Sequence, residues 1–194
     1  MRWRIVKGFC MDRIVKSIEK QYLLPSLELV EDVFTRYDCA EEGKMVRRLV
    51  EEIRGKKYYI PALDLVMVDG EDAVIGYAMF SRFPIEGKYE DELLILTPVA
   101  VKTELQRQHI SKELLEYGFE KARELGFKAV LVEGDPNNYR SRGFRPSYLF
   151  GIEAGPKVKL PHPDCLMVKE LAEGALNKMS GFVDYSFYEA LHEG

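Results

Sequence analysis

Cysteine, histidine and long apolar runs are all scarce in this chain. Its three cysteines include no CxxC pair, which argues against a disulfide framework and fits a reducing compartment. Its three histidines lie far apart and show no HExxH spacing, so we expect no metal site. No apolar run approaches the roughly 18 residues of a membrane span. The net charge of −4 disfavours general nucleic-acid binding. We therefore expect a cytoplasmic protein with neither membrane nor nucleic-acid partners.

The composition is that of a globular domain. Hydrophobic residues make up 46% and charged residues 31% of the 194 residues, which excludes a disordered or fibrous chain. The sequence Arg-Ile-Val-Lys occurs twice, at 4–7 and at 13–16. We expect the second copy to form the first strand, because a helical segment follows it directly. The chain would then consist of an N-terminal extension, residues 1–11, and one domain, residues 12–194.

The pattern of apolar residues predicts a mixture of helices and strands. Apolar residues recur with a period near 3.6 in three segments, which predicts helices at about 25–34, 41–54 and 111–125. Apolar runs bounded by turn residues predict strands at 63–68, 74–80, 93–101 and 129–132, the first two joined as a hairpin. Shorter elements are expected as a turn or helix at 137–142 and as strands near Phe150 and at 165–171. The strand–helix–strand order between 93 and 132 predicts a parallel pair of strands.

Pro98 interrupts the apolar run from Leu93 to Val101. Proline cannot donate a hydrogen bond to a sheet ladder, so this position indicates a bulge or a place where neighbouring strands part. An early end of the strand is the simpler alternative. We favour the bulge, because Val99–Val101 continues the apolar pattern beyond the proline.

The turn after Val101 precedes the start of the helix near Ser111. Backbone N–H groups at a helix start lack partners and attract anions, and Arg107 and Lys112 add full positive charges. Most helix starts bind nothing, so the turn alone is weak evidence. A parted strand next to it would also offer backbone groups to an extended ligand that carries amides. A ligand with a pyrophosphate at one end and amides along its arm fits both features, and coenzyme A is such a molecule.

Several ordered motifs resemble one family. The segment Gln106–Ser111 and the helix after it are similar to motif A of the GNAT superfamily of N-acetyltransferases, written Gln/Arg-x-x-Gly-x-Gly/Ala. Gly134-Asp135-Pro136, followed by Tyr-x-x-x-Gly-Phe at 139–144, resembles a bacterial branch of predicted acetyltransferases. The late segment 165–171 resembles a strand of that branch. The likeness runs from about Arg13 to the C-terminus and is strongest between Pro98 and Phe144.

The resemblance implies a fold and a set of site residues. The fold would be α/β, a mixed and strongly twisted sheet with helices on both faces, and acetyl-CoA would lie between splayed fourth and fifth strands. The backbone of Val99 and Val101 would pair with the pantetheine arm, and Gln106–Lys112 would surround the pyrophosphate. Tyr139 would protonate the departing thiolate after direct attack by an amine, near its normal pKa of about 10. The co-substrate-binding residues would be Val99, Ala100, Val101, Gln106, Arg107, Gln108, His109, Ile110, Ser111 and Lys112.

Two positions depart from the family pattern. His109 stands at the first motif glycine, where the backbone must adopt a positive φ or lie close to phosphate. Histidine is one of the few other residues enriched at positive φ, and a negative φ would instead require its side chain to swing away or to bind phosphate. Ile95 stands where many members carry a glutamate that serves as base. Asp91 and Glu92 at the start of that strand, and Glu133 at the end of the next, are either candidate bases or plain surface charges. We assign no general base, so either water relays the proton or the acceptor arrives neutral.

The sequence leaves two alternatives open. The favoured function is transfer of acetyl to an unidentified amine, either a small molecule or a peptide, and the chain would work alone or as a homodimer. The rival is a protein of the same fold that binds acyl-CoA or a partner and transfers nothing, which His109 and Ile95 favour. The aromatic residues near the C-terminus, which include Tyr185 and Tyr188, would either line an acceptor pocket or dock on the core.

Overall fold

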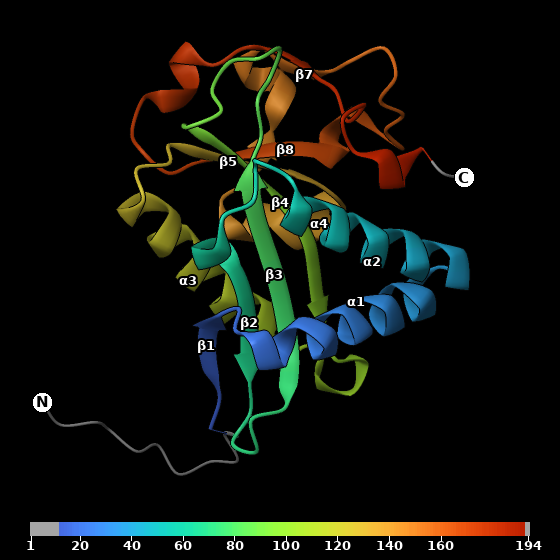
Figure 1. Ribbon diagram of the computed structural model, residues 1–194. Helices are drawn as coiled ribbons and strands as arrows, with labels where there is room; N and C mark the ends of the chain where they lie inside the picture. Colours follow the sequence, from blue (N-terminus) through green and yellow to red (C-terminus); the bar gives the residue numbers. More distant parts are fainter. Residues whose placement is uncertain (1–11, 193–194) are drawn as a thin grey trace, which may run out of the picture.

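The computed structural model describes residues 12–192 (Figure 1). The expected extension at residues 1–11 lies outside this described part, so the proposed domain boundary stays a prediction. Within residues 12–192, no helix is both long and apolar enough to cross a membrane.

The described residues form one large sheet. It has seven strands in the order β1–β2–β3–β4–β5–β8–β6. Their bounds are β1 Ile14–Ser17, β2 Asp64–Val68, β3 Val74–Arg82, β4 Leu93–Val101, β5 Ala129–Glu133, β8 Leu166–Glu170 and β6 Arg145–Pro146. Only β4 and β5 run parallel among these neighbours, and the other pairs are antiparallel. The second copy of the repeat therefore forms the first strand, as expected, and the predicted hairpin and parallel pair are confirmed.

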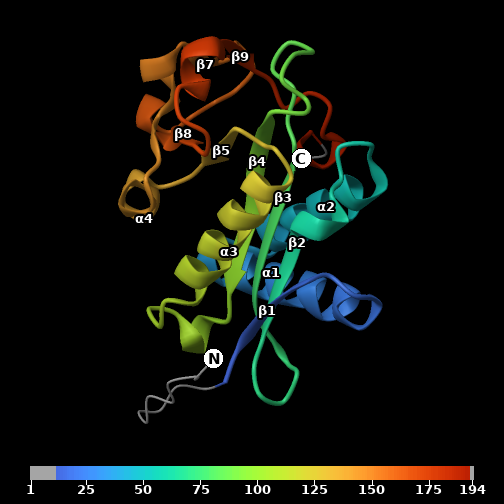
Figure 2. The same ribbon diagram turned by 90° about the vertical axis from the view of Figure 1, so that its left-hand side faces the viewer.

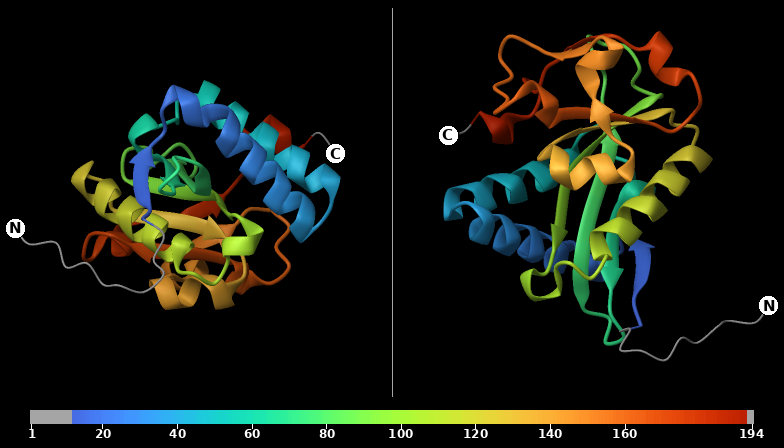
Figure 3. Two further views of the ribbon diagram at one scale, coloured as in Figure 1. Left: turned by 90° about the horizontal axis from the view of Figure 1, so that it is seen from below. Right: turned by 180° about the vertical axis from the view of Figure 1, so that it is seen from behind.

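Helices cover both faces of this sheet, as the sequence predicts. The helices α1, Leu23–Tyr37, and α2, Ala40–Gly55, lie together on one face, and α3, Ile110–Glu124, lies on the other (Figures 2 and 3). A short helix, α4, spans Pro136–Tyr139 after β5. The chain also forms short 3₁₀ helices at Lys20–Tyr22, Pro61–Leu63, Thr103–Leu105, Arg140–Arg142, Ser147–Phe150, Pro163–Cys165, Ala175–Lys178 and Glu189–Leu191.

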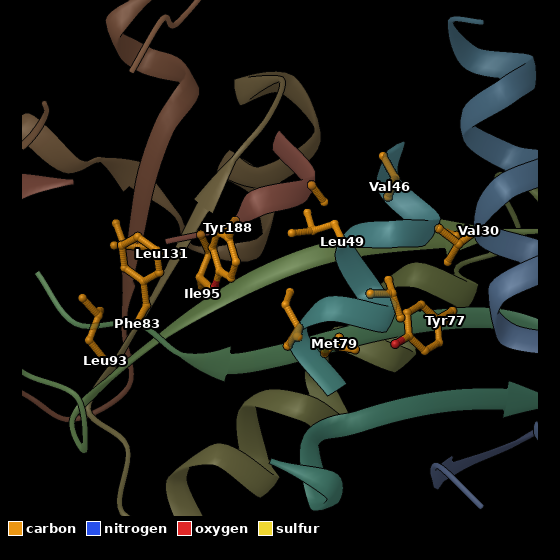
Figure 4. Packing of buried hydrophobic residues seen from close by; sticks show 14 of the residues in the cluster. Val30, Val46, Leu49, Tyr77, Met79, Phe83, Leu93, Ile95, Leu131 and Tyr188 are labelled. Atoms are coloured by element: carbon orange, nitrogen blue, oxygen red, sulfur yellow. The ribbon is translucent and has the colours of Figure 1, made fainter. Parts of the chain in front are cut away.

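Alternating side chains of the central strands divide the core into two layers. Tyr77 and Met79 of β3 pack toward α1 and α2, whereas Ala78 and Phe80 pack toward α3. Figure 4 shows the first layer. In the second layer, a Cβ at Gly118 of α3 would lie only 2.4 Å from the Phe80 ring. The absence of a side chain at Gly118 therefore lets α3 pack closely on β3.

The structure adds detail to the prediction in the region after β5. The strand expected near Phe150 is confirmed as β7, Ile152–Ala154, which begins just after a 3₁₀ helix that ends at Phe150. Gly151 has a φ of 73°, which turns the chain between these two elements. The strand β7 pairs in parallel with β9, Gly181–Val183, which forms a small second sheet near the C-terminus.

Candidate active site

The ladder between β4 and β5 is formed over only part of its length. It pairs Leu93 with Ala129 and ends where Ile95 pairs with Leu131. Just beyond, Thr97 and Pro98 of β4 together oppose Met79 of β3, so the expected bulge at Pro98 is confirmed. From Leu96 to Val101, β4 pairs with β3 alone among the described residues. The two central strands therefore separate at the bulge, as the sequence predicts.

The hydrogen-bond pattern fixes which backbone groups face this opening. The N–H of Lys102 donates to the carbonyl of Ile75 on β3 at 3.1 Å. Because alternate residues of an antiparallel strand point to opposite sides, Ala100 also faces β3. Val99 and Val101 consequently direct their N–H and C=O groups into the opening.

The opening continues into a cleft of about 1700 Å³. Most of the residues predicted to bind a co-substrate line it, together with the predicted acid: Val99, Val101, Gln106, Arg107, His109, Ile110, Ser111, Lys112 and Tyr139. Two predicted residues have other surroundings. Ala100 is buried in the layer beneath α1 and α2, and the carbonyl of Gln108 accepts a hydrogen bond from Arg13 at 2.9 Å. Ala100 and Gln108 thus shape the site from behind its surface.

The turn before α3 has the backbone shape of an anion site. Arg107 and His109 both have left-handed backbone, with φ values of 64° and 63°. His109 therefore adopts the conformation for which glycine is usual, which decides between the two alternatives for this residue. Left-handed residues that alternate with ordinary ones make N–H groups converge, and the first N–H groups of a helix have no partner inside the helix. The exposed side chains of Arg107 and Lys112 add positive charge at the same place.

Arg13 holds this turn in position from behind. Its Nε donates to the Glu113 carboxylate at 2.9 Å, in the first turn of α3, and its Nη2 donates to the carbonyl of Gln108. Arg13 directly precedes β1, so it links the edge of the sheet to the start of α3. Sequence reasoning did not identify this role, because 95 residues separate Arg13 from Gln108.

The segment Gly134-Asp135-Pro136 sets the position of Tyr139. The Asp135 carboxylate accepts a hydrogen bond from the N–H of Asn137 at 2.9 Å and so caps α4, in which Pro136 is the first residue. A Cβ at Gly134 would lie 2.7 Å from the Tyr139 ring, so only glycine leaves space for that ring. Tyr139 also packs edge-on against Phe144, with ring centroids 5.5 Å apart.

The surroundings of Tyr139 keep its hydroxyl protonated. Burial raises its pKa above the ordinary value of 10, and the nearby Arg142 guanidinium offsets part of this effect. The sequence-based expectation of a normal pKa is therefore corrected upward. A tyrosine with a raised pKa still carries its proton at neutral pH and can donate it.

Arg142 connects the region around Tyr139 to the start of α3. Its Nη2 donates to the Ser111 hydroxyl at 2.9 Å, and its carbonyl accepts from Lys169 Nζ at 2.7 Å. Its Nε is buried without a hydrogen-bond partner among the described residues. Burial lowers the pKa of Lys169, and the positive charge of Arg123 adds to that effect. Sequence reasoning passed over Arg142 and Lys169, although Arg142 stands inside the Tyr-x-x-x-Gly-Phe motif.

The helices α1 and α2, strand β4 and the C-terminal segment contribute a group of apolar and aromatic side chains to the cleft. Figure 4 shows Tyr188 beside Ile95 of β4 and toward Leu49 of α2. Phe34 of α1 and Met45 of α2 line the same cleft. Two of the aromatic residues near the C-terminus, Tyr185 and Tyr188, pack on the core and also line the cleft. Docking on the core is therefore confirmed for them, and a role in an acceptor pocket stays a prediction.

The sequence profile of the acetyltransferase (GNAT) family matches residues 27–145. The uncharacterized N-acetyltransferase YhbS of Escherichia coli (strain K12) is 30% identical over 147 residues, which cover 74% of this chain and 83% of that protein. A second Escherichia coli K12 protein, the uncharacterized N-acetyltransferase YjhQ, is 29% identical over 145 residues, or 73% of this chain and 77% of that protein.

Solved structures share the whole fold. The crystal structure of YhbS from Escherichia coli in complex with CoA has a TM-score of 0.80 at 24% identity and covers 97% of this chain and 96% of that one. A GNAT family acetyltransferase from Brucella melitensis in complex with acetyl-CoA has a TM-score of 0.69 at 21% identity, covering 94% and 99%. At these identities the likeness establishes a common architecture.

Proposed function

Because the chain belongs to the GNAT family of acetyltransferases, we propose that it transfers the acetyl group of acetyl-CoA to the nitrogen of a primary amine. One observation carries this proposal. The free backbone groups of Val99 and Val101 lie in the same cleft as the anion-binding turn at the start of α3. An extended arm that carries amides and ends in a pyrophosphate complements both features. The crystallisation of two similar proteins with CoA or acetyl-CoA supports it.

The residues of the cleft have distinct roles in this proposal. Val99 and Val101 would bind the amides of the pantetheine arm, and the turn from Gln106 to Lys112 would bind the pyrophosphate. Arg142 would add a charged donor through its unpartnered Nε. The thioester, when bound, supplies an activated acetyl group, so the protein has mainly to position it and the amine. Tyr139 would donate a proton to the sulfur as it leaves.

The expected setting is one domain in a reducing compartment. Among the described residues, Cys39 and Cys165 are free thiols, which is usual in the cytoplasm. We therefore propose that residues 12–194 act there as a single acetyltransferase domain.

Two measurements, made one after the other, test the proposal. Calorimetric titration with acetyl-CoA should give saturable binding, and a thiol-release assay with a panel of primary amines should show turnover. Binding without release over the whole panel would favour the rival, a protein that holds acyl-CoA without transfer. The absence of both binding heat and thiol release would contradict the proposed function altogether.

A further inference from the structure

Three cleft-lining residues, Arg142, Tyr185 and Tyr188, carry a buried polar atom without a hydrogen-bond partner among the described residues, and Tyr185 is the one that lies next to Glu133. The hydroxyl oxygen of Tyr185 is buried and makes no hydrogen bond of ordinary geometry among residues 12–192, although the Glu133 carboxylate lies close enough to interact with it. Buried polar groups in native proteins are almost always hydrogen-bonded, because burial without a partner is costly. The group that Tyr185 faces is the Glu133 carboxylate, and both residues line the cleft. An ionised carboxylate has about four acceptor sites, so Tyr185 and a ligand can share it.

The place of Glu133 in the sheet is informative. Glu133 ends β5, two residues after Leu131, whose partner Ile95 closes the β4–β5 ladder. Residues two apart in a strand share a face of the sheet, so Glu133 lies on the same face as Leu131 and Ile95, the one that α1 and α2 cover. Glu133 is thus the first carboxylate beyond the point where the strands part. Tyr139 follows the same strand but packs in the layer on the α3 side.

The surface next to Glu133 is apolar and aromatic. Ile95, Leu49, Met45, Phe34 and Tyr188 line the cleft. Apolar walls bind the carbon skeleton of an apolar amine well. They stabilise a polyamine, which carries charges along its whole length, much less. Besides Tyr185 and Tyr188, the charged or titratable residues that α1, α2 and the loop segments after β7 contribute to the cleft are Arg36, Tyr37, Glu42, Lys157, Lys159, Asp184 and His192.

We propose that Glu133 is a catalytic residue that binds the ammonium group of the acceptor and takes its proton. Tyr185 positions the Glu133 carboxylate. The acceptor is a primary amine attached to an apolar carbon skeleton. This inference rests on the proposed function and deepens it. It also explains why position 95 can be an isoleucine and not the glutamate base of many family members, because the neighbouring strand supplies a carboxylate on the same face of the sheet.

The proposed step balances in atoms and charge. The ammonium group gives one proton to Glu133, which later releases it to solvent. The nitrogen lone pair then attacks the carbonyl carbon, an N–C bond forms, the C–S bond breaks, and its electron pair leaves with the sulfur. Tyr139 gives that sulfur a proton and is restored by the second proton that the nitrogen loses. The products are the acetylated amine, the free thiol and one proton in solution.

The electrostatic surroundings of Glu133 suit a base. The Glu133 side chain keeps solvent contact at the end of β5, but the groups packed around its carboxyl still remove part of its hydration and raise its pKa above the ordinary value, and the Tyr185 hydroxyl partly offsets this shift. A base works best when its pKa lies near the working pH. The rate should therefore fall as the pH drops through this raised pKa, and removal of the Tyr185 hydroxyl should move that fall to higher pH.

The experiment uses 2-phenylethylamine as the probe amine and follows thiol release from acetyl-CoA against pH. The variant Glu133→Gln should lower kcat about 100-fold or more and abolish the acid limb of the kcat/KM profile, while its Kd for acetyl-CoA stays within about twofold of the wild type. Tyr185→Phe should retain turnover with the acid limb displaced upward. Glu133→Asp should recover part of the rate. The matched control Glu153→Gln, at an exposed position of strand β7, should behave as the wild type.

The outcomes separate this inference from the function on which it rests. Full turnover and an unchanged pH profile in Glu133→Gln would overturn the role of Glu133 while leaving acetyl transfer intact. An equal loss of acetyl-CoA binding in that variant would overturn it too, because the carboxylate would then serve the co-substrate or the fold. Faster turnover of spermidine than of 2-phenylethylamine would overturn the apolar acceptor. A wild-type protein that neither binds acetyl-CoA nor releases thiol would remove the proposed function itself.

Discussion

Two arginines, Arg54 and Arg142, lie in polar clusters of opposite character. Arg54 of α2 donates from Nε to Asp64 at 2.9 Å and from Nη2 to Ser26 of α1 at 2.9 Å, and its Nη1 contacts the carbonyl of Leu23 at 3.4 Å. Asp64, fully buried, also accepts from the Tyr59 hydroxyl at 2.9 Å. Arg142 and Tyr185 in the cleft, in contrast, each keep a buried polar atom without a partner among the described residues.

The difference separates stability from function. The Arg54 cluster joins α1, α2 and the sheet, and all three nitrogens of its guanidinium are used by the protein itself. Neighbouring residues position the side chains of the cleft groups but leave some of their polar atoms without a hydrogen bond. Such atoms are available to a ligand. Substitutions in the first cluster should therefore damage the fold, and substitutions in the second should damage binding or turnover.

The largest expected effect is on stability. Arg54→Met leaves the Asp64 charge buried without its main partner, so we expect a loss of about 3–5 kcal/mol in the free energy of unfolding. Urea denaturation measures this loss. The control is Arg47→Met, whose bond to Glu31 joins two side chains about one third exposed and should be worth about 0–1 kcal/mol. Equal losses in both variants would break the distinction between a satisfied buried cluster and an ordinary surface pair.

Turnover should depend on the Tyr139 hydroxyl. Tyr139→Phe keeps the ring that packs on Phe144 but removes the proton donor, so kcat should fall about 100-fold with little change in the affinity for acetyl-CoA. Thiol release under saturating amine measures the effect. If Tyr139→Phe turns over at the wild-type rate, another group protonates the sulfur.

Co-substrate binding should depend on Arg142. Arg142→Met removes the donor that we assign to acetyl-CoA, and a hydrogen bond to a charged group is worth about 1.5–3 kcal/mol, so the Kd should rise about 10- to 100-fold. The control is Arg145→Met. Arg145 lies on the short strand β6, and its guanidinium stacks on the Phe150 ring. Calorimetry should show an unchanged Kd there, and a similar rise in both variants would indicate a general charge effect.

The smallest expected effect is a difference in the free energy of unfolding between two Tyr→Phe variants. Tyr59→Phe removes a hydroxyl that donates to buried Asp64 and should cost about 1–3 kcal/mol. Tyr185→Phe removes a hydroxyl that makes no hydrogen bond of ordinary geometry and interacts only weakly with Glu133, so it should leave the unfolding free energy unchanged or slightly raised. Parallel thermal melts measure both. Destabilisation by Tyr185→Phe would show that its hydroxyl already supports the fold.

Local chemistry explains what the sequence could predict. Pro98 indicates the bulge because its missing N–H is a property of one residue, and the strand after it is recognisable from three apolar residues. The pattern in Gly134–Pro136 likewise predicts a turn or short helix next to Tyr139, and the structure adds why glycine is needed. The left-handed backbone of His109 was one of two alternatives that its side chain allowed.

Contacts between distant segments explain what it could not predict. The pairing of β7 with β9 and the contact of Tyr185 with the end of β5 join segments tens of residues apart, and no local pattern indicates them. Arg142 and Arg13 were overlooked for the same reason, since arginines are common and only the folded chain shows that Arg142 lines the cleft and that Arg13 supports the turn before α3. The strand expected near Phe150 starts at Ile152, and only the structure shows that the left-handed Gly151 separates it from the 3₁₀ helix before it.

The account depends most on the open half of β4. Amide hydrogen exchange followed by NMR can report on single N–H groups with and without saturating CoA. We predict that exchange at Val99 and Val101 slows when CoA is added, whereas the N–H of Lys102, already bonded to Ile75, changes little. Binding of CoA with unchanged exchange at both valines would show that the ligand lies elsewhere and would contradict the proposed site.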